Sequence, residues 1–418
     1  MKIKLAFPIE NIRASFLVAE KIYRSLISII LASLIARTYG PAEYGLLAFI
    51  TTNLALASIF LSLGLEGPLL RQLSLKDRIN HLNSFLEIKI AACLFATLIS
   101  LMCWPLIQPS EHFLYLLLLL YIPFTCLELF EVELLSNNQQ MSLAKIKIFC
   151  CSFIAIVKAV IIFHQLPLNL LLITYAAEPC ITNACIFMLA KKNRNRKLIS
   201  LPFLSSFKSI ITESMPLWVS ALGIAAYTRV DQIIIARSLG EQQLGIYVAA
   251  TQIISFFNFI PVALYNSHAA SFLSLQKNNE KISNEKFVAL FIKFNKAALA
   301  SSIFILLCAD SIINLAYGEK FQASALILKT LTISNFFVFM GVAHSLWILS
   351  NQKPLVRLYG TIATAILSIT LNLLLTPHFG LVSAAIVASL AQSFAAFFAN
   401  YIWAKESFIL QIKSLGIK

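Results

Sequence analysis

The stretch from Tyr227 to Ala249 reads YTRVDQIIIARSLGEQQLGIYVA, and part of it repeats an earlier stretch of the same chain. Residues 236–245, ARSLGEQQLG, correspond to residues 36–45, ARTYGPAEYG, at a shift of 200 positions. Both copies contain Ala, Arg, a hydroxyl residue, Gly and a second Gly five positions later. A duplicated half-molecule is the simplest explanation of such a repeat.

The composition of the chain excludes a soluble globular protein. Of its 418 residues, 59% are hydrophobic and 12% are charged, and the mean hydropathy is +0.81. A soluble domain carries about 25% charged residues. Because one membrane crossing needs roughly 20 apolar residues, we expect an all-α integral membrane protein with about a dozen helices.

Apolar runs separated by polar turns predict twelve transmembrane helices. Their approximate ranges are 14–38, 44–65, 85–106, 112–134, a fifth run that ends near 163, 168–190, 212–238, 245–272, 287–312, 323–349, 355–375 and 380–403. Pro123 should break the fourth helix. A cleavable signal peptide is the alternative for the first run, but its apolar core should be much shorter.

The basic segment KKNRNRK, residues 191–197, is the natural boundary between the halves. The sequence therefore predicts an N-terminal six-helix lobe, 1–197, and a C-terminal six-helix lobe, 198–418. Six crossings per half give both lobes the same orientation, which makes them parallel repeats about an axis along the membrane normal. In membrane proteins such repeats usually face a central pathway, so we expect a transporter.

The basic residues of the connections alternate between the two sides of the membrane. One side, which includes both termini, holds 23 Lys and Arg, and the other side holds only Arg37, Arg237 and Lys320. The positive-inside rule then places both termini in the cytoplasm. The same distribution argues against nucleic acid as a partner, although the net charge is +14.

Ionised side chains inside a membrane helix are costly, so each needs a partner or water. Lys89, Lys158 and Lys329 lie within about two turns of a helix end, and we expect them to extend to the interface. Arg24 lies deeper, and Lys21, three residues before it, shares its face of the first helix. Two interpretations stay open for them: an ion pair with Glu20, four residues before Arg24, or the basic lining of a water-filled cavity that receives a phosphate or pyrophosphate.

Arg229 and Lys296 also lie deep in their helices. Arg229 and Asp231 do not face each other, because they are two residues apart on a helix, so each needs a partner elsewhere. Glu178 is followed by Pro179, which frees a backbone carbonyl one turn earlier. A buried carboxylate can carry a proton or hold a cation, so Glu178 and Asp231 are candidates for H⁺ or Na⁺ coupling. Pairing with a lysine of another helix is an equal expectation for Glu178.

The sequence shows no catalytic constellation. Its six histidines have no metal-ligand spacing, and it contains neither a Gly-rich phosphate loop nor a G-x-S-x-G motif. We therefore expect no enzymatic activity, no resident metal and no cofactor.

Four stretches carry a resemblance to a known family. They read LIARTYGPAEYGLLAF (34–49), SLGLEGPLLRQL (62–73), YTRVDQIIIARSLGEQQLGIY (227–247) and LYGTIATAILSITLNLLLTPHFGLVSAAIVASL (358–390). Over nearly its whole length the chain resembles polysaccharide flippases of the O-antigen transporter kind, the Wzx family. This family belongs to the multidrug/oligosaccharidyl-lipid/polysaccharide exporter superfamily.

The resemblance implies a cavity between the lobes that opens alternately to each side. Its cargo would be a short oligosaccharide on undecaprenyl pyrophosphate, carried from the cytoplasmic to the periplasmic face of the bacterial inner membrane for lipopolysaccharide synthesis. Membrane lipid, a polysaccharide polymerase and a chain-length regulator are the implied partners. The candidates for headgroup binding are Lys21, Arg24, Arg229 and Lys296. Arg71 matches the family's arginine after the second helix and would line the cytoplasmic mouth or anchor the topology.

Other functions fit the sequence less well. A drug or metabolite antiporter of the same superfamily should favour an acidic cavity for cationic cargo, whereas the deep charges here lean basic. A polysaccharide polymerase should show a long exterior loop, and a membrane glycosyltransferase should show acidic motifs at a helix mouth; the predicted exterior connections are short. A structural scaffold does not explain costly charges at depth.

Overall fold

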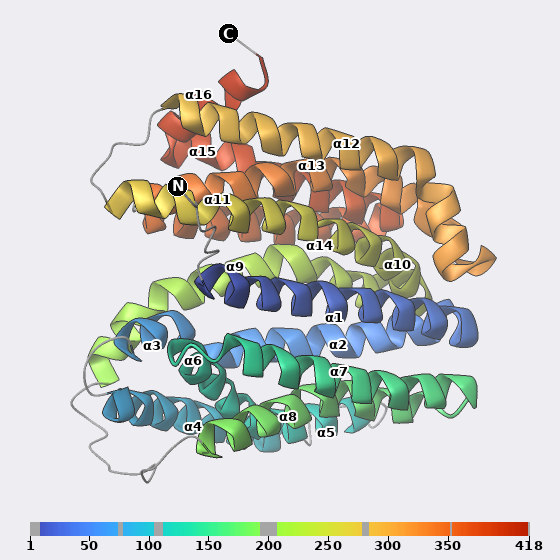
Figure 1. The fold of residues 1–418 in the computed structure, drawn as a ribbon. Coiled ribbons are helices and arrows are strands. Elements are labelled where there is room, and N and C mark those ends of the chain that lie inside the picture. The colour runs from blue at the N-terminus through green and yellow to red at the C-terminus, as the bar shows by residue number, and fades with distance from the viewer. Residues whose placement is uncertain are drawn as a thin grey trace, which may run out of the picture. The chain divides into compact units, whose positions relative to one another are not determined.

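The computed structural model of the chain describes residues 9–73, 78–103, 112–192, 207–277, 284–351 and 353–416. Every regular element in these residues is helical (Figure 1). In chain order they are α1 (Ile9–Tyr39), α2 (Pro41–Ser62), α3 (Glu66–Leu73), α4 (Arg78–Cys103), α5 (His112–Tyr121), η3 (Ile122–Glu128), α6 (Leu129–Ser136), α7 (Gln140–Phe163), α8 (Leu168–Lys192), α9 (Phe207–Leu239), α10 (Glu241–Phe257), α11 (Phe259–Lys277), α12 (Asn284–Tyr317), η4 (Glu319–Phe321), α13 (Ala323–Ser350), α14 (Pro354–Ser393), η5 (Phe394–Phe398), α15 (Ala399–Trp403) and α16 (Lys405–Ser414).

Ten segments of the described residues are helical, long and apolar enough to cross a membrane. The last of them, Leu355–Trp403, has 49 residues, and Gly380 inside it has a φ of 74°, so two helices join there. α1 has 31 residues and is not among the ten. These helices confirm the prediction of an all-α, multi-pass membrane protein, and each of the twelve expected runs overlaps helix.

Prolines decide where two of the expected helices are interrupted. The fourth is broken as predicted: α5 gives way to the 3₁₀ helix η3, which has Pro123 in its first turn. The eighth, predicted over 245–272, is divided into α10 and α11 at Asn258. Pro261 lies in the first turn of α11. Because proline cannot donate a backbone hydrogen bond to the preceding turn, it favours a helix start at this point.

The helices pack as two compact units that are not two simple halves of the sequence. The first unit takes the residues up to Leu31 and Asn53–Trp218, and the second takes Ala32–Thr52 and Val219–Lys418. α1, α2 and α9 therefore contribute to both units. The predicted division into lobes at residue 197 stays a prediction.

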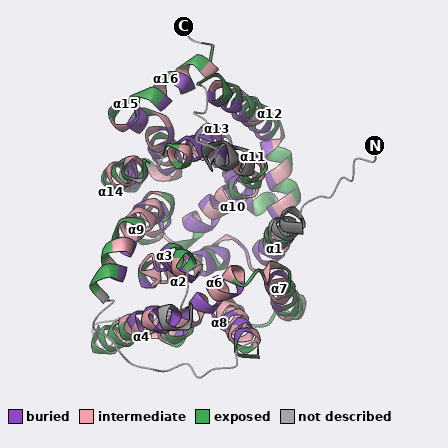
Figure 2. Cartoon of the chain, turned by 60° about the vertical axis from the view of Figure 1, so that its left-hand side comes forward, coloured by how far each residue is buried: buried purple, intermediate pink, exposed green. Residues whose placement is uncertain are grey.

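Apolar side chains at helical spacing form the core of each unit. In the first unit, α3, α4, α6 and α8 bury residues such as Leu69, Phe85 and Ile186 in one cluster. In the second unit, α12 turns a stripe that includes Phe291 and Phe294 toward α13. Figure 2 shows buried residues on one face of α12 and exposed residues on the other. Large apolar side chains on the exposed faces, such as Leu307 of α12 at 78% exposure, suit contact with lipid.

The two copies of the repeated motif meet inside the second unit. Gly40 and Gly240 follow α1 and α9 with φ angles of 87° and 90°, a conformation that glycine adopts without strain. A Cβ atom on Gly45 would lie 1.8 Å from the carbonyl oxygen of Glu241, and a Cβ atom on Gly245 would lie 2.0 Å from that of Pro41. The starts of α2 and α10 therefore cross with their backbones in contact, which only glycine permits.

Candidate functional site

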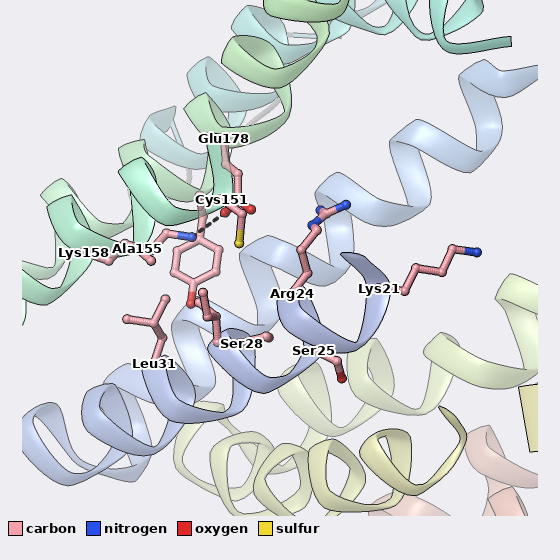
Figure 3. Close-up of a pocket in the computed structure, with 11 residues that line it drawn as sticks. Lys21, Arg24, Ser25, Ser28, Leu31, Cys151, Ala155, Lys158 and Glu178 are labelled. Carbon is pink, nitrogen blue, oxygen red and sulfur yellow. Dashed lines mark hydrogen bonds and ion pairs between the residues drawn. The ribbon is translucent and has the colours of Figure 1, made fainter. Parts of the chain in front are cut away.

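A polar pocket of about 390 Å³ lies within the first unit (Figure 3). Three helices supply its lining: α1 gives Lys21, Arg24, Ser25, Ile27, Ser28 and Leu31, α7 gives Cys151, Ala155 and Lys158, and α8 gives Tyr175 and Glu178. Helical spacing explains the grouping, because residues three, four and seven positions apart lie on one face. Lys21, Arg24 and Ser28 follow this spacing on α1, as do Cys151, Ala155 and Lys158 on α7.

An ion pair connects α7 to α8 at the pocket. Lys158 Nζ lies 2.6 Å from Glu178 Oε2 and 3.4 Å from the centre of the Tyr175 ring. The Lys158 side chain is only 3% exposed. The expectation that Lys158 extends to the membrane interface is therefore wrong, because a carboxylate and an aromatic face compensate the charge where it is. The structure confirms the other expectation for Glu178, a lysine partner from another helix.

Arg24 forms the ion pair that was one of the two interpretations, and it also lines the pocket; its part in binding an anion stays a prediction. Its Nη1 atom lies 3.2 Å from Glu20 Oε1, and its side chain is 43% exposed and lines the pocket. A guanidinium has five N–H donors, so one bond to Glu20 leaves others for a ligand. Figure 3 shows Arg24 extending from α1 near the Lys158–Glu178 pair, while Lys21 points away from that pair.

The charge of the pocket is predominantly positive. Lys21, Arg24 and Lys158 line it together with one carboxylate, that of Glu178. Lys21 is exposed and forms no ion pair with any residue that the structure describes. A cavity of this kind, on helices that belong in a membrane, is suited to an anionic group that can accept several hydrogen bonds.

Sequence reasoning missed Lys158, Tyr175, Ser28 and Cys151 as lining residues. The signal for Lys158 was present, because α7 and α8 are joined by a short turn and each carries one ionisable residue of opposite charge in its interior. A hydrogen bond between Tyr23 Oη and Ser152 Oγ, 2.7 Å long, also connects α1 to α7 beside the pocket. No pattern in the sequence indicates that contact.

The other predicted cations do not line this pocket. Arg71 on α3 is 73% exposed and pairs with Glu213 of α9 at 3.1 Å. Arg229 on α9 and Lys296 on α12 belong to the second unit and are exposed. Their part in headgroup binding stays a prediction.

Asp231 is buried in the second unit and is held by neutral donors. Tyr247 Oη donates to Asp231 Oδ2 at 2.5 Å, and the backbone N–H of Gln232 donates to Oδ1 at 2.8 Å. The Gln232 side chain in turn accepts a hydrogen bond from Thr52 Oγ1 at 2.5 Å. We call Asp231, Gln232, Tyr247 and Thr52 the Asp231 cluster. Because Arg229 is exposed while Asp231 is buried, the structure confirms that the two do not pair.

Two further ion pairs involve lysines that were expected at the interface. Lys89 is 1% exposed and lies 3.3 Å from Glu128 Oε2, so the interface expectation is wrong for Lys89 as well. Lys329 Nζ lies 2.6 Å from Asp310 Oδ2 and is 35% exposed. Within the described residues no group of three or more His, Cys, Asp and Glu could hold a metal ion. The expectation that the protein needs no metal stays a prediction.

The chain is similar in sequence to proteins of polysaccharide biosynthesis. The profile of a family described as "Polysaccharide biosynthesis protein" matches residues 13–270. A relative from Staphylococcus aureus, the capsular polysaccharide biosynthesis protein CapF, is 23% identical over 289 residues, which cover 65% of this chain and 69% of the relative.

Solved structures of transporters share the fold. The lipid II flippase MurJ in an inward closed conformation superposes with a TM-score of 0.75 at 15% identity, over 95% of this chain and 90% of that one. An inward-facing multidrug resistance transporter of the MATE family, in the MOP superfamily, gives a TM-score of 0.67 at 15% identity, over 95% and 99% of the two chains. A MOP superfamily transporter from Pyrococcus furiosus gives 0.65 at 14% identity, over 96% of each.

Proposed function

The chain belongs to the polysaccharide biosynthesis protein family, and from this premise we propose that it is a flippase for a lipid-linked polysaccharide precursor. The proposed cargo is a short oligosaccharide on undecaprenyl pyrophosphate, such as an O-antigen repeat unit. The protein moves it from the cytoplasmic to the periplasmic face of the inner membrane by alternating access, with both termini in the cytoplasm. The fold shared with MurJ and MATE transporters supports a transporter, and the basic pocket supports this class of cargo.

The observation that carries the proposal is the excess of cations in the pocket of the first unit. A pyrophosphate presents several oxygens that accept hydrogen bonds, and charge-assisted bonds from arginine and lysine to phosphate are among the strongest in proteins. Arg24 and Lys21 have N–H donors available for a ligand. Lys158 lines the same pocket but is paired with Glu178. The same lining disfavours a cationic drug, which would face Lys21, Arg24 and Lys158, opposed only by Glu178 and by the buried Glu20 that pairs with Arg24.

The Lys158–Glu178 pair suggests how transport is coupled to an ion. In the proposed cycle the pyrophosphate competes with Glu178 for Lys158, and the released carboxylate takes up a proton or a sodium ion. Return of the empty carrier restores the pair. Asp231 is the second candidate for coupling, although its hydrogen bonds suit a structural role equally well.

An accumulation assay tests the proposed function. Cells that lack the protein should retain lipid-linked oligosaccharide on the cytoplasmic face, and the wild-type protein should restore delivery to the periplasmic face. A variant with Glu20→Gln and Arg24→Gln should fail to restore delivery at equal expression. The Lys405→Gln variant, altered at an exposed residue of α16 outside the pocket, should restore it fully. A normal distribution of the oligosaccharide in cells without the protein would contradict the proposal.

A further inference from the structure

The second unit contains a separate pocket of about 200 Å³. It is formed by α9, α13, α14, η5 and α15, and none of the described residues that line it is acidic. Small residues let the helices of its wall approach closely: a Cβ atom on Gly341 would lie 3.3 Å from Ala396 Cβ, and one on Gly360 would lie 3.6 Å from Ala399 Cβ. The wall at η5, Phe394–Phe398, is a π-helix. Single π-helical turns are rare and frequently mark functional sites.

The polar side chains of this pocket fall into two groups. Those of the first group already have partners: His344 Nδ1 lies 2.8 Å from Ser407 Oγ, Ser345 donates to the Gly341 carbonyl, and Thr361 donates to the Leu358 carbonyl. Asn400 donates to the Ala396 carbonyl and to Gln411. These bonds fix the orientation of the side chains and stabilise the walls of the pocket.

The second group consists of Tyr227, Arg357 and Gln392. Each lines the pocket, and none forms a hydrogen bond or an ion pair with another residue that the structure describes. Tyr227 comes from α9, while Arg357 and Gln392 come from opposite ends of α14. Together they offer a planar cation, an amide and a phenol around one space. Apolar side chains such as Ile224, Val338 and Ile348 complete the lining.

We propose that this pocket binds a single acidic sugar residue, a hexuronate, of the cargo glycan. This assignment rests on the proposed function for the nature of the cargo. The Arg357 guanidinium suits a carboxylate because its paired N–H groups match the two carboxylate oxygens. Gln392 and Tyr227 bind ring hydroxyls, and the apolar lining contacts the C–H face of the sugar. Ligand pockets for drug-sized molecules start at about 300 Å³, so a smaller space suits one sugar residue.

The number of cations separates this pocket from the pocket of the first unit. There, Lys21, Arg24 and Lys158 suit the several charges of a pyrophosphate. Here, Arg357 is the one Lys or Arg among the described lining residues, which suits a single negative charge. Phosphate, whether free or on a lipid headgroup, is the competing source of negative charge, and the test distinguishes it.

The experiment measures binding of methyl β-glucuronide to the purified full-length protein in detergent by saturation-transfer NMR. Methyl β-glucoside serves as the neutral analogue, and inorganic phosphate and glycerophosphate serve as competitors. We expect the glucuronide to bind about tenfold more tightly than the glucoside, since a charge-assisted hydrogen bond is worth about that factor. Neither phosphate compound should displace it at an equal concentration.

Variants assign the binding to this pocket. Arg357→Gln should reduce glucuronide affinity about tenfold, to the level of the glucoside. Arg357→Lys keeps the charge without the paired donors and should give an intermediate affinity. Lys405→Gln is the control and should bind normally. Unchanged affinity in Arg357→Gln, equal affinity for glucuronide and glucoside, or displacement by phosphate would each overturn the proposal.

The outcome is separable from that of the proposed function. The variant with Glu20→Gln and Arg24→Gln should lose pyrophosphate binding and keep glucuronide binding. Loss of the glucuronide site with pyrophosphate binding intact would overturn only this inference. Glucuronide binding without any binding of pyrophosphate would contradict the flippase cargo and support the sugar site on its own.

Discussion

The basic pocket of the first unit and the Asp231 cluster of the second unit hold charge within helices in opposite ways. The pocket is an open space of about 390 Å³, and Arg24 extends into it with its side chain 43% exposed. Asp231 is 5% exposed, and Tyr247 and Gln232 both donate hydrogen bonds to its carboxylate. One region leaves donors available to a ligand, and the other satisfies its charge internally.

This difference shows which buried charges point to a ligand. An ionised group in a membrane helix is costly whatever its role, so its presence alone does not distinguish binding from structure. A cavity and donors without partners do distinguish them. By that criterion Lys21 and Arg24 of the first unit are candidates for binding, and Asp231 is a candidate for a structural role.

The largest effect on stability is expected where α2 and α10 cross, near the Asp231 cluster. In Gly245→Ala the new methyl group would lie 2.0 Å from the Pro41 carbonyl oxygen, and the backbones of α2 and α10 would have to separate. Overpacking a well-packed site costs roughly 1–3 kcal/mol, and rigid backbone on both sides favours the upper end of that range. Thermal unfolding in detergent should show a strongly lowered Tm or no folded protein.

Gly67→Ala is the matched control for this prediction. The added methyl group would lie 3.3 Å from Leu217 Cδ1, the end of a flexible side chain. Its Tm should stay close to that of the wild type. Equal Tm values for the two alanine variants would show that α2 and α10 do not cross at Gly45 and Gly245.

The next largest effect is expected on transport, from changes in the basic pocket of the first unit. Arg24→Gln alone would leave the buried Glu20 carboxylate without its partner, so it should lower both transport and stability. Adding Glu20→Gln removes that charge and should restore the Tm. Delivery of the lipid-linked oligosaccharide should stay at least about tenfold lower in the double variant, because the loss of a charge-assisted bond to phosphate is not repaired. Recovery of transport together with stability would assign the pair a structural role.

A smaller effect is expected in the Asp231 cluster. Asp231→Asn preserves size but replaces one carboxylate oxygen by an amide NH₂ group. Either Tyr247 Oη or the Gln232 backbone N–H, which now donate to the two carboxylate oxygens, would then lose its acceptor. Leaving one buried donor unsatisfied costs about 1–3 kcal/mol, so the Tm should fall. Transport measured below the Tm should be retained. An unchanged Tm with transport abolished would instead make Asp231 a coupling residue.

The smallest effect is expected for Arg71→Gln. Arg71 is 73% exposed and pairs with Glu213, and an exposed ion pair contributes about 0–1 kcal/mol. Both the Tm and the transport rate should stay near the wild-type values. A transport defect of about tenfold, the size expected for Arg24, would place Arg71 in the cargo path.

The sequence predicts the class of fold because the bilayer imposes strong constraints on length and polarity. The apolar runs, the break at Pro123 and the repeated motif all have local causes, and the structure agrees with them. The sequence does not predict that residues 32–52 pack with the second unit. That packing depends on contacts such as the one between Gly45 and Glu241, which are about 200 positions apart in the sequence.

The candidate site was predicted only in part for the same reason. Lys21 and Arg24 were found because they share a helix face, which spacing reveals. The position of Lys158 near a helix end predicts the wrong location for its side chain. The structure shows that Glu178 and the Tyr175 ring hold it at the pocket. Partners on other helices are set by tertiary packing, which spacing along one helix does not contain.

Direct binding of the headgroup tests the central claim, that the cations of the first unit bind pyrophosphate. Purified protein in nanodiscs is titrated with a short-chain polyprenyl pyrophosphate, and its affinity is compared with that of the variant that combines Lys21→Gln, Glu20→Gln and Arg24→Gln. We predict saturable binding to the wild-type protein and a loss of at least about tenfold in the variant, at an unchanged Tm. Equal affinity of the two proteins would contradict the account.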